Sequence, residues 1–343
     1  MRLVFDRQRE LIVGVGSALV DILIHESDAF LEKSGAIKGG MTLVDEEFIQ
    51  RILERTSSKP VIVSGGSACN TIVGVGQLDG RARFVGKCGS GEWGRLFRRG
   101  LITQNVEPAL FSSLSPTGRV LSIITPDAQR SMFTFLGASS ETQADEISSV
   151  SFENTAVVHI EGYLLFNPEL ILAAVKHAKA CGAMVSLDLA SFTVVDGARD
   201  LLDHIVTNFV DIVIANEDEA RVFTGCTTDM DALEVLAHKA DIAVVKLGRR
   251  GSLIAYQNAV LKIEVRGDGN ALDTTGAGDL WAAGFLYGLV KGYPLELCGD
   301  IGSLCGYEVC QVIGACIPED GWKRIKRMEA KWLEKRKSAA SNC

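Results

Sequence analysis

No apolar run in this 343-residue sequence is long enough to span a bilayer, which takes about 20 residues. The first ten residues are rich in charged side chains where a secretory leader has an apolar core. The nine cysteines are scattered and form no C-x-x-C pair, and an odd number of such thiols is typical of reduced proteins. We therefore expect a cytoplasmic protein with no membrane partner.

An excess of positive charge is also missing. The formal net charge is −8, so the chain has no basic field for nucleic acid, and an anionic ligand would need a local cationic pocket. A G-x-x-x-x-G-K-[ST] phosphate loop is absent too, so any nucleotide must be bound by other means. No linker or repeat interrupts residues 1–343, and this length suits a single large domain.

The segment 11–16 is an apolar run that ends in Gly14-x-Gly16, as in a buried strand that opens a dinucleotide fold. Leu19 stands where that fold needs its third glycine, and Asp21 comes too early to bind the ribose. A dinucleotide-dependent oxidoreductase is therefore a distant alternative.

From residue 155 onward, short apolar strands alternate with helical segments over short connections. Strands are expected at 156–160, 184–188, 211–215 and 241–246, and helices at 168–182, 197–208, 217–224 and 230–239. This alternation predicts a mostly parallel sheet with helices on both faces. Ligands should then collect at the C-terminal ends of the strands.

Two earlier stretches do not follow this alternation. One consists of short extended runs around a single helix and resembles an inserted antiparallel piece, whereas the other resembles a hairpin with a Pro-Asp turn. We expect the two stretches, 18–45 and 112–137, to pair as one small sheet. That sheet would form a lid over the main domain.

The most informative stretch is Asp273-Thr274-Thr275-Gly276-Ala277-Gly278-Asp279, which leads into the apolar run 280–286. A glycine-rich turn that opens a helix directs backbone N–H groups and the positive end of the helix dipole at one spot, which makes an anion site. Asp279 falls in the first helical turn, where it can take a proton from a hydroxyl that attacks a bound phosphate. A plain helix cap is the alternative, but the two glycines that flank Ala277 exceed what a cap needs.

This motif resembles the signature of the ribokinase-like (PfkB) carbohydrate and nucleoside kinases. The resemblance implies an α/β, three-layer fold with a mostly parallel central sheet and a small β-strand lid. It also implies an ATP-dependent kinase in which Gly276, Ala277 and Gly278 hold the phosphate and Asp279 is the general base. ATP and Mg²⁺ are then expected, K⁺ near Asp273 and Thr275 is left open, and the chain is expected to be a monomer or homodimer.

Substrate-binding residues are expected in three places. Gly65, Gly66 and Asn70 match a Gly-Gly-x-x-x-Asn element of the family, and an amide there can both donate to and accept from a sugar. Asp21 resembles the family's acid for substrate hydroxyls, and Arg130 lies near a position where the family has a basic residue facing substrate or phosphate. The plainer alternatives are an ordinary strand-to-helix turn and exposed strand residues.

The nucleotide side is expected at two later strand ends. Asn216 and Glu219 share a helix face and resemble an Asn-x-x-Glu motif that acts on Mg²⁺ through water, although a capping box would explain them equally well. Gly248-x-x-Gly251 matches a loop that lines the nucleotide. Lys246 is also assigned to ATP, but it departs from the small hydroxyl residue that the family often has there.

Within the family, the sequence is most similar to the adenosine-kinase-like branch. Tyr163, Leu164 and Phe192 follow strand ends, where a flat base could stack, which favours a nucleoside phosphorylated at its primary hydroxyl. Thr275 instead is a feature shared with sugar kinases, so ribokinase- or fructokinase-type activity is an alternative. A catalytically inactive, ligand-binding family member is another, and the presence of Asp279 argues against it.

Overall fold

The computed structural model describes residues 8–36, 38–127 and 129–341, with side chains as far as 335. Within these residues, nine strands form a central sheet whose neighbours from β12 to β6 pair in parallel, while β13 and β14 add an antiparallel edge. In spatial order the strands are β14 (Ala259–Ile263), β13 (Ser252–Tyr256), β12 (Ile242–Lys246), β11 (Ile212–Asn216), β10 (Met184–Asp188), β9 (Thr155–Glu161), β1 (Leu11–Val15), β5 (Arg81–Gly89) and β6 (Val106–Ser113).

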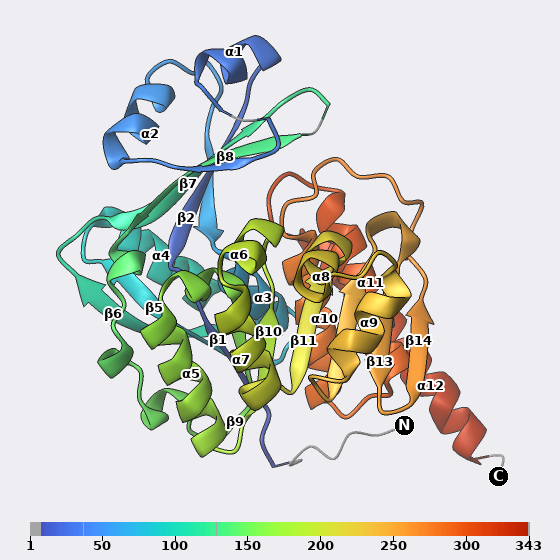
Figure 1. Cartoon of the computed structure of the whole chain (residues 1–343). Coiled ribbons are helices and arrows are strands. Elements are labelled where there is room, and N and C mark those ends of the chain that lie inside the picture. Colours follow the sequence, from blue (N-terminus) through green and yellow to red (C-terminus); the bar gives the residue numbers. More distant parts are fainter. Residues whose placement is uncertain (1–7, 37, 128, 342–343) are drawn as a thin grey trace.

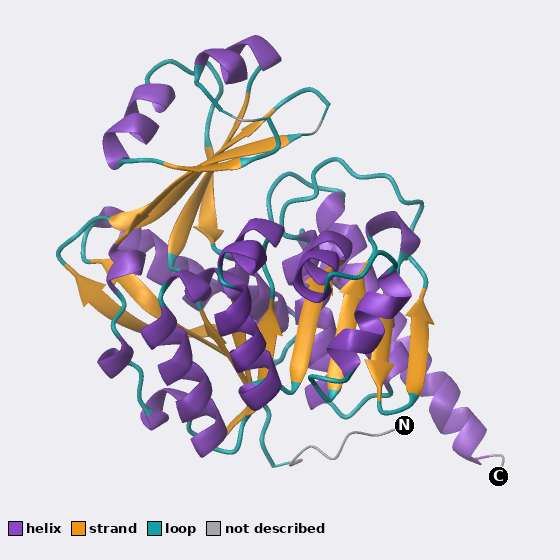
Figure 2. Ribbon diagram, in the orientation of Figure 1, coloured by secondary structure: helices purple, strands orange, loops and turns teal. Residues whose placement is uncertain are grey.

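Helices cover both faces of the central sheet (Figures 1 and 2). The apolar core on one face includes α3 (Ser67–Gln77), α4 (Glu92–Thr103), α10 (Ala277–Val290), α11 (Leu295–Cys310) and α12 (Glu319–Ser341). The core on the other face includes α5 (Pro168–Ala180), α6 (Phe192–Gly197), α7 (Arg199–Phe209), α8 (Glu217–Thr224) and α9 (Asp229–Ala237). None of the described helices is long and apolar enough to cross a membrane.

Side chains of one strand alternate between these two cores. On β11, Ile212 and Ile214 join the α10 side, whereas Val213 and Ala215 join the α8 side. Because both faces are apolar, the strand reads as a continuous hydrophobic run, which is typical of a parallel strand buried between helices. The expected three-layer α/β fold with a mostly parallel sheet is therefore confirmed.

A second, five-stranded sheet stands above the C-terminal ends of the central strands, at the top of Figure 1. We call this sheet, together with two short helices, α1 (Asp28–Lys33) and α2 (Glu46–Leu53), the lid. Its strands in spatial order are β3 (Met41–Leu43), β8 (Arg130–Gly137), β7 (Thr117–Ile124), β2 (Leu19–His25) and β4 (Val61–Gly65). Two separate excursions of the chain build it, one between β1 and α3 and the other between β6 and β9.

The two faces of the lid sheet have different surroundings. Ile22, Ile24 and Leu121 point to one side, where they form a small core with Leu31 of α1 and Ile49 of α2. The intervening side chains on the same strands point the other way, because strand residues alternate between faces. The lid is therefore covered by helices on its outer face only.

Several details of the lid differ from the expectation. The predicted hairpin of β7 and β8 is confirmed, but β2 pairs in parallel with β7 and β3 in parallel with β8, so the first piece is not antiparallel throughout. β4 also belongs to the lid, although the predicted ranges 18–45 and 112–137 leave it out. Strand β6, at the edge of the central sheet, has no counterpart in the sequence prediction.

Arg119 of β7 joins the lid to the main body. Its guanidinium lies 5.5 Å from the ring centroid of Trp93 on α4 and 5.6 Å from that of Phe135 on β8, and it forms an ion pair with Glu46 at the start of α2. Cation–π contacts with a buried guanidinium stabilise such a junction by about 0.5–2 kcal/mol each. The base of the lid is thus a packed contact.

Candidate active site

A cavity of about 1200 Å³ lies where the ends of the central strands meet the open face of the lid. The lid lines it with mostly apolar side chains, whereas the main body contributes both polar groups and the aromatic and apolar side chains of Tyr163, Leu164 and Phe166. The lid residues are Leu19, Asp21, Met41, Leu43, Val120, Arg130, Met132, Thr134 and Leu136. This position agrees with the rule that ligands of open α/β sheets bind beyond the C-terminal strand ends.

The glycine-rich turn opens α10 at the floor of this cavity. Gly276 is the N-cap residue with φ of 73°, a left-handed conformation that disfavours other residues, and a Cβ there would lie 2.6 Å from Ala315 Cβ. Ala277 N–H donates to Thr274 O at 3.2 Å, so this amide closes the turn. The N–H groups of Gly276, Gly278 and Asp279 have no partner among the described residues and are the donors that remain for an anion.

Asp273 shapes the turn from below. Its Oδ1 accepts from Thr275 N–H and Thr275 Oγ1 at 2.9 and 2.7 Å, and its Oδ2 accepts from Gly314 N–H at 2.8 Å. These three hydrogen bonds give the carboxylate and the Thr275 hydroxyl a structural function. K⁺ binding near this pair stays a prediction.

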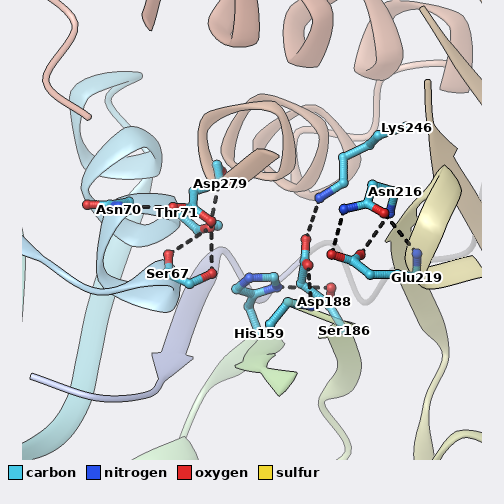
Figure 3. A network of polar contacts seen from close by, with 11 residues as sticks. Ser67, Asn70, Thr71, His159, Ser186, Asp188, Asn216, Glu219, Lys246 and Asp279 are labelled. Carbon is cyan, nitrogen blue, oxygen red and sulfur yellow. Dashed lines mark hydrogen bonds and ion pairs between the residues drawn. The ribbon is translucent and has the colours of Figure 1, made fainter. Parts of the chain in front are cut away.

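Asp279 is held by three side chains of α3 (Figure 3). Ser67 Oγ donates to Asp279 Oδ1 at 2.8 Å and Asn70 Nδ2 donates to Oδ2 at 2.9 Å, while Thr71 Oγ1 donates to the backbone oxygen of Asp279 at 3.1 Å. Burial raises the pKa of Asp279, and the two side-chain donors oppose that shift. The carboxylate is thus fixed in direction and more basic than an exposed aspartate, as a general base requires.

Asn70 therefore has a contact that differs from its predicted one. Its amide nitrogen donates a hydrogen bond to Asp279, although the side chain also lines the cavity. Ser67, the other donor, was not predicted at all. Its place directly after Gly65-Gly66, at the start of a helix whose other polar residues face the motif, was the available signal.

The acceptor side of the cavity is marked by Asp21. This residue is 6% exposed, and no hydrogen bond to its carboxylate is present among the described residues, so the oxygens stay available to a ligand. Gly65 makes room for it, because a Cβ there would lie 2.2 Å from Asp21 Cγ. Burial raises the pKa of Asp21 to about 6, against the opposing charge of Arg130.

Arg130, Gly66 and Tyr163 line the same cavity, as predicted, and Leu164 does so too. The prediction for Phe192 is wrong. Its side chain is 53% exposed at the first residue of α6 and does not line the cavity. Phe166, at the end of the 3₁₀ helix Gly162–Phe166, lines the cavity, and its side chain is 65% exposed.

The remaining polar groups of the cavity lie at the ends of three neighbouring strands. Asp188 ends β10, Asn216 ends β11 and Lys246 ends β12, so their side chains meet at one edge of the sheet. Lys246 Nζ lies 2.7 Å from Asp188 Oδ2, and both side chains are nearly buried (Figure 3). Asp188 Oδ1 accepts from Ala190 N–H at 3.0 Å.

Asn216 and Glu219 form the capping box that the sequence offers as an alternative to a Mg²⁺-binding motif. Asn216 Oδ1 accepts from the Asp218 and Glu219 N–H groups, while the Glu219 carboxylate accepts from Asn216 N–H and Asn216 Nδ2 at 2.8 and 2.7 Å. Burial and the charge of Asp188 raise the pKa of Glu219 to about 7, against the opposing charge of Lys246. Both residues still line the cavity, so the capping function does not remove them from the site.

The described residues contain no group of three or more His, Cys, Asp or Glu side chains placed to hold a metal directly. Each oxygen of the Glu219 carboxylate has one hydrogen-bond partner and keeps a further lone pair, and the residue lines the cavity. This arrangement suits Mg²⁺ that keeps its waters and is held mainly by phosphates.

The loop after β12 lies across the cavity from the lid. Gly248 and Gly251 bracket a short 3₁₀ helix, Gly248–Arg250, and both line the cavity. Leu247 N–H donates to Gly251 O at 2.8 Å, which closes the loop. Val265, Asn270 and Tyr307 continue this wall beyond the predicted residues.

A model of the pfkB family of carbohydrate kinases matches residues 35–321 of the chain. The match spans most of the lid, the capping-box helix and the turn at Gly276, so the chain belongs to this family and is a phosphotransferase. Its fold is the ribokinase-like fold.

Proteins named as nucleoside and sugar kinases are among the relatives that resemble it. The crystal structure of adenosine kinase from Sinorhizobium meliloti is 32% identical, with a TM-score of 0.86 over 94% of this chain and 99% of that chain. A probable sugar kinase from Rhizobium etli is also 32% identical, with a TM-score of 0.88 and the same coverage. Adenosine kinase 2 of Arabidopsis thaliana is 24% identical over 335 residues, which are 90% of this chain and 96% of that protein. These likenesses support the adenosine-kinase-like branch.

Proposed function

We propose that the protein transfers the γ-phosphate of ATP to the primary hydroxyl of a ribose-containing nucleoside similar to adenosine. The single observation that carries the proposal is the geometry of Asp279. Its carboxylate is held by Ser67 and Asn70 beside the free N–H groups that open α10, so a base and an anion site lie together. A kinase needs this pair because phosphoryl transfer depends mainly on positioning and charge stabilisation.

In the proposed step, Asp279 takes the proton of the acceptor hydroxyl. The hydroxyl oxygen then forms a bond to the γ-phosphorus, and the bond from that phosphorus to the β,γ-bridging oxygen breaks. The electron pair of the broken bond stays on ADP. The N–H groups of Gly278 and Asp279 stabilise the charge on the phosphoryl oxygens during the transfer.

The nucleotide lies, in this proposal, along the wall that contains Asn216, Lys246, Gly248 and Gly251. Asn216 and Glu219 would orient Mg²⁺ through its waters, and the ion supplies neutralisation of phosphate charge when bound. The acceptor lies on the lid side, where Asp21 has unpaired oxygens.

The acceptor assignment is supported by the cavity lining that follows β9. Tyr163, Leu164 and Phe166 offer an apolar and aromatic surface that a flat base fills and a bare sugar leaves open. The relatives named adenosine kinase point the same way.

A sugar kinase is the second candidate, and one observation favours it. The relative from Rhizobium etli, described as a probable sugar kinase, has the same identity to this chain as the bacterial adenosine kinase. An inactive binding protein is less well supported, because the base, its two donors and the anion-binding turn are all present.

We further propose that the reaction takes place in the cytoplasm, on two small molecules, in a monomer or homodimer. The net charge of −8 offers no field for nucleic acid, and the cavity has the volume of a small-molecule site.

The test is the kcat/KM of the full chain with MgATP for adenosine, other nucleosides, ribose and fructose. We expect adenosine or another nucleoside to exceed both sugars by at least about tenfold, because the apolar wall stays empty with a sugar. The Asp279→Asn variant is the matched control for contaminating kinases. Faster turnover of ribose or fructose than of every nucleoside would reverse the order of the two candidates.

A further inference from the structure

Lys246 is a nearly buried cation at the centre of the site. Its side chain is 14% exposed, and its Nζ is 2.7 Å from Asp188 Oδ2. A Cβ placed on Gly278 would lie 2.9 Å from that Nζ, so the ammonium rests against the first turn of α10. It is therefore next to the backbone N–H groups that form the anion site.

The ammonium stays charged there. Burial by itself lowers the pKa of Lys246, but the charges of Asp188 and Glu219 and the hydrogen bond to Asp188 outweigh burial and raise the pKa above its ordinary value. An ammonium has three N–H donors, and within the described part of the chain only Asp188 accepts from one of them. Two donors are therefore free, on a side chain that lines the cavity.

A structural explanation of the Lys246–Asp188 pair is weak. A buried ion pair costs desolvation that its attraction often fails to offset, so such a pair is poor evidence for stability. Both groups lie at strand ends that line the cavity. A pair whose only function is structural gains no stability from that position.

We propose that Lys246 is a catalytic residue whose ammonium donates hydrogen bonds to the γ-phosphoryl group of ATP during its transfer, and that Asp188 is a positioning residue that holds the ammonium in place. The proposal rests on the phosphotransfer proposed above. Lys246 stays protonated throughout: Asp279 takes the hydroxyl proton, the new bond forms at the γ-phosphorus, and the electron pair of the broken bond stays on ADP. Asp279 and Lys246 flank the start of α10 (Figure 3).

This assignment predicts a difference between two nucleotides. ADP lacks the phosphoryl group that Lys246 contacts, so removal of the ammonium should weaken ATP binding and leave ADP binding nearly unchanged. A hydrogen bond to a charged group typically contributes enough to change affinity by roughly 10–100-fold. Removal of a donor to transition-state charge lowers kcat by roughly 10²–10³-fold.

The experiment compares Lys246→Met with the wild-type chain. Titration calorimetry with MgATP and with MgADP gives the two affinities, and steady-state kinetics gives kcat with the best acceptor. We expect the Kd for ATP to rise about 10–100-fold, the Kd for ADP to change less than about threefold, and kcat to fall about 10²–10³-fold.

The double variant Lys246→Met/Asp188→Asn separates catalysis from packing. It removes the unpaired buried carboxylate that the single variant leaves, so it should recover thermal stability but not kcat. Recovery of kcat in the double variant, or equal loss of ATP and ADP affinity in the single one, would overturn the proposal. The binding readout needs no acceptor, so a wrong acceptor leaves this test intact, whereas a wild-type chain that binds neither nucleotide would overturn the kinase proposal as well.

Discussion

The two sheets of the molecule bury their faces differently. Helices cover both faces of the central sheet, and its strands alternate between two large apolar cores. The lid sheet is covered by α1, α2 and part of α4 on one face, and its other face forms a wall of the cavity. A sheet that packs against helices on both faces is held in position. A sheet with one open face can move toward or away from the main body across the cavity.

The functional groups divide along the same line. The main body contributes Asp279, Lys246 and Glu219, each held by a neighbour through a hydrogen bond or ion pair. The lid contributes Asp21 and Arg130, and the carboxylate of Asp21 has no hydrogen-bond partner within the described residues. We infer that groups for the chemistry are fixed in advance, while groups for the acceptor obtain their partners only when the acceptor binds.

Asp279→Asn should produce the largest effect, because it removes the proposed base from the fixed side. We expect kcat to fall about 10²–10⁴-fold with the Kd for ATP nearly unchanged, since Ser67 can still donate to the amide oxygen of the new side chain. Steady-state kinetics and nucleotide titration measure the two quantities, and thermal unfolding controls for folding. Near-wild-type kcat in this variant would show that the contacts of Asp279 with α3 are only structural.

A change at Asp21 should instead affect the acceptor. With its pKa raised to about 6 by burial, Asp21 becomes protonated below that pH and can no longer accept from two hydroxyls, so the KM for the acceptor should rise as pH falls through 6. In Asp21→Asn we expect a KM about 10–100-fold higher at pH 8 and no such rise at low pH. Measurements of KM from pH 5 to 8 on both proteins test this, and a rise in KM at low pH that persists in Asp21→Asn would show that another group causes it.

The same substitution, Asp21→Asn, should weaken acceptor binding but increase the stability of the fold. A carboxyl whose pKa is raised on folding destabilises the folded state above that pKa, and the penalty disappears below the ordinary value of 3.8. Asp21→Asn should therefore unfold at a higher temperature than the wild-type chain at pH 8. This control separates loss of acceptor binding from damage to the fold.

The smallest expected effect concerns motion. If the lid closes on the acceptor, with Gly65 and Gly66 as the hinge, amide exchange in 18–45 and 117–136 should slow several-fold when the acceptor binds. Peptides from α10 and β11, in the fixed body, are the internal reference. Equal exchange with and without the acceptor would show that the lid is static and that the two sheets do not differ in this respect.

The sequence was sufficient for most of the fold. Apolar runs that alternate with helical segments predicted β9 to β12 within one or two residues, because such strands are buried on both faces and their pattern does not depend on distant partners. The turn at Gly276 was equally predictable from the sequence, because its left-handed backbone and its close packing both require glycine.

The lid and the precise contacts were less predictable. Pairing of β2 with β7 joins segments far apart in the chain, and no local pattern distinguishes parallel from antiparallel neighbours. Whether Asn70 faces a sugar or Asp279 depends on the packing of α3 against α10, which sequence spacing does not encode. Phe192 and Phe166 both follow strand ends, and only the path of each loop decides which one reaches the cavity.

The two chain segments that build the lid also form its inner surface, which lines the cavity. Leu19, Met41, Val120 and Met132 line the cavity from the lid, and none of them belongs to either of the two large cores. Substitutions at these positions can therefore reshape the acceptor space at little cost to the stability of the catalytic body.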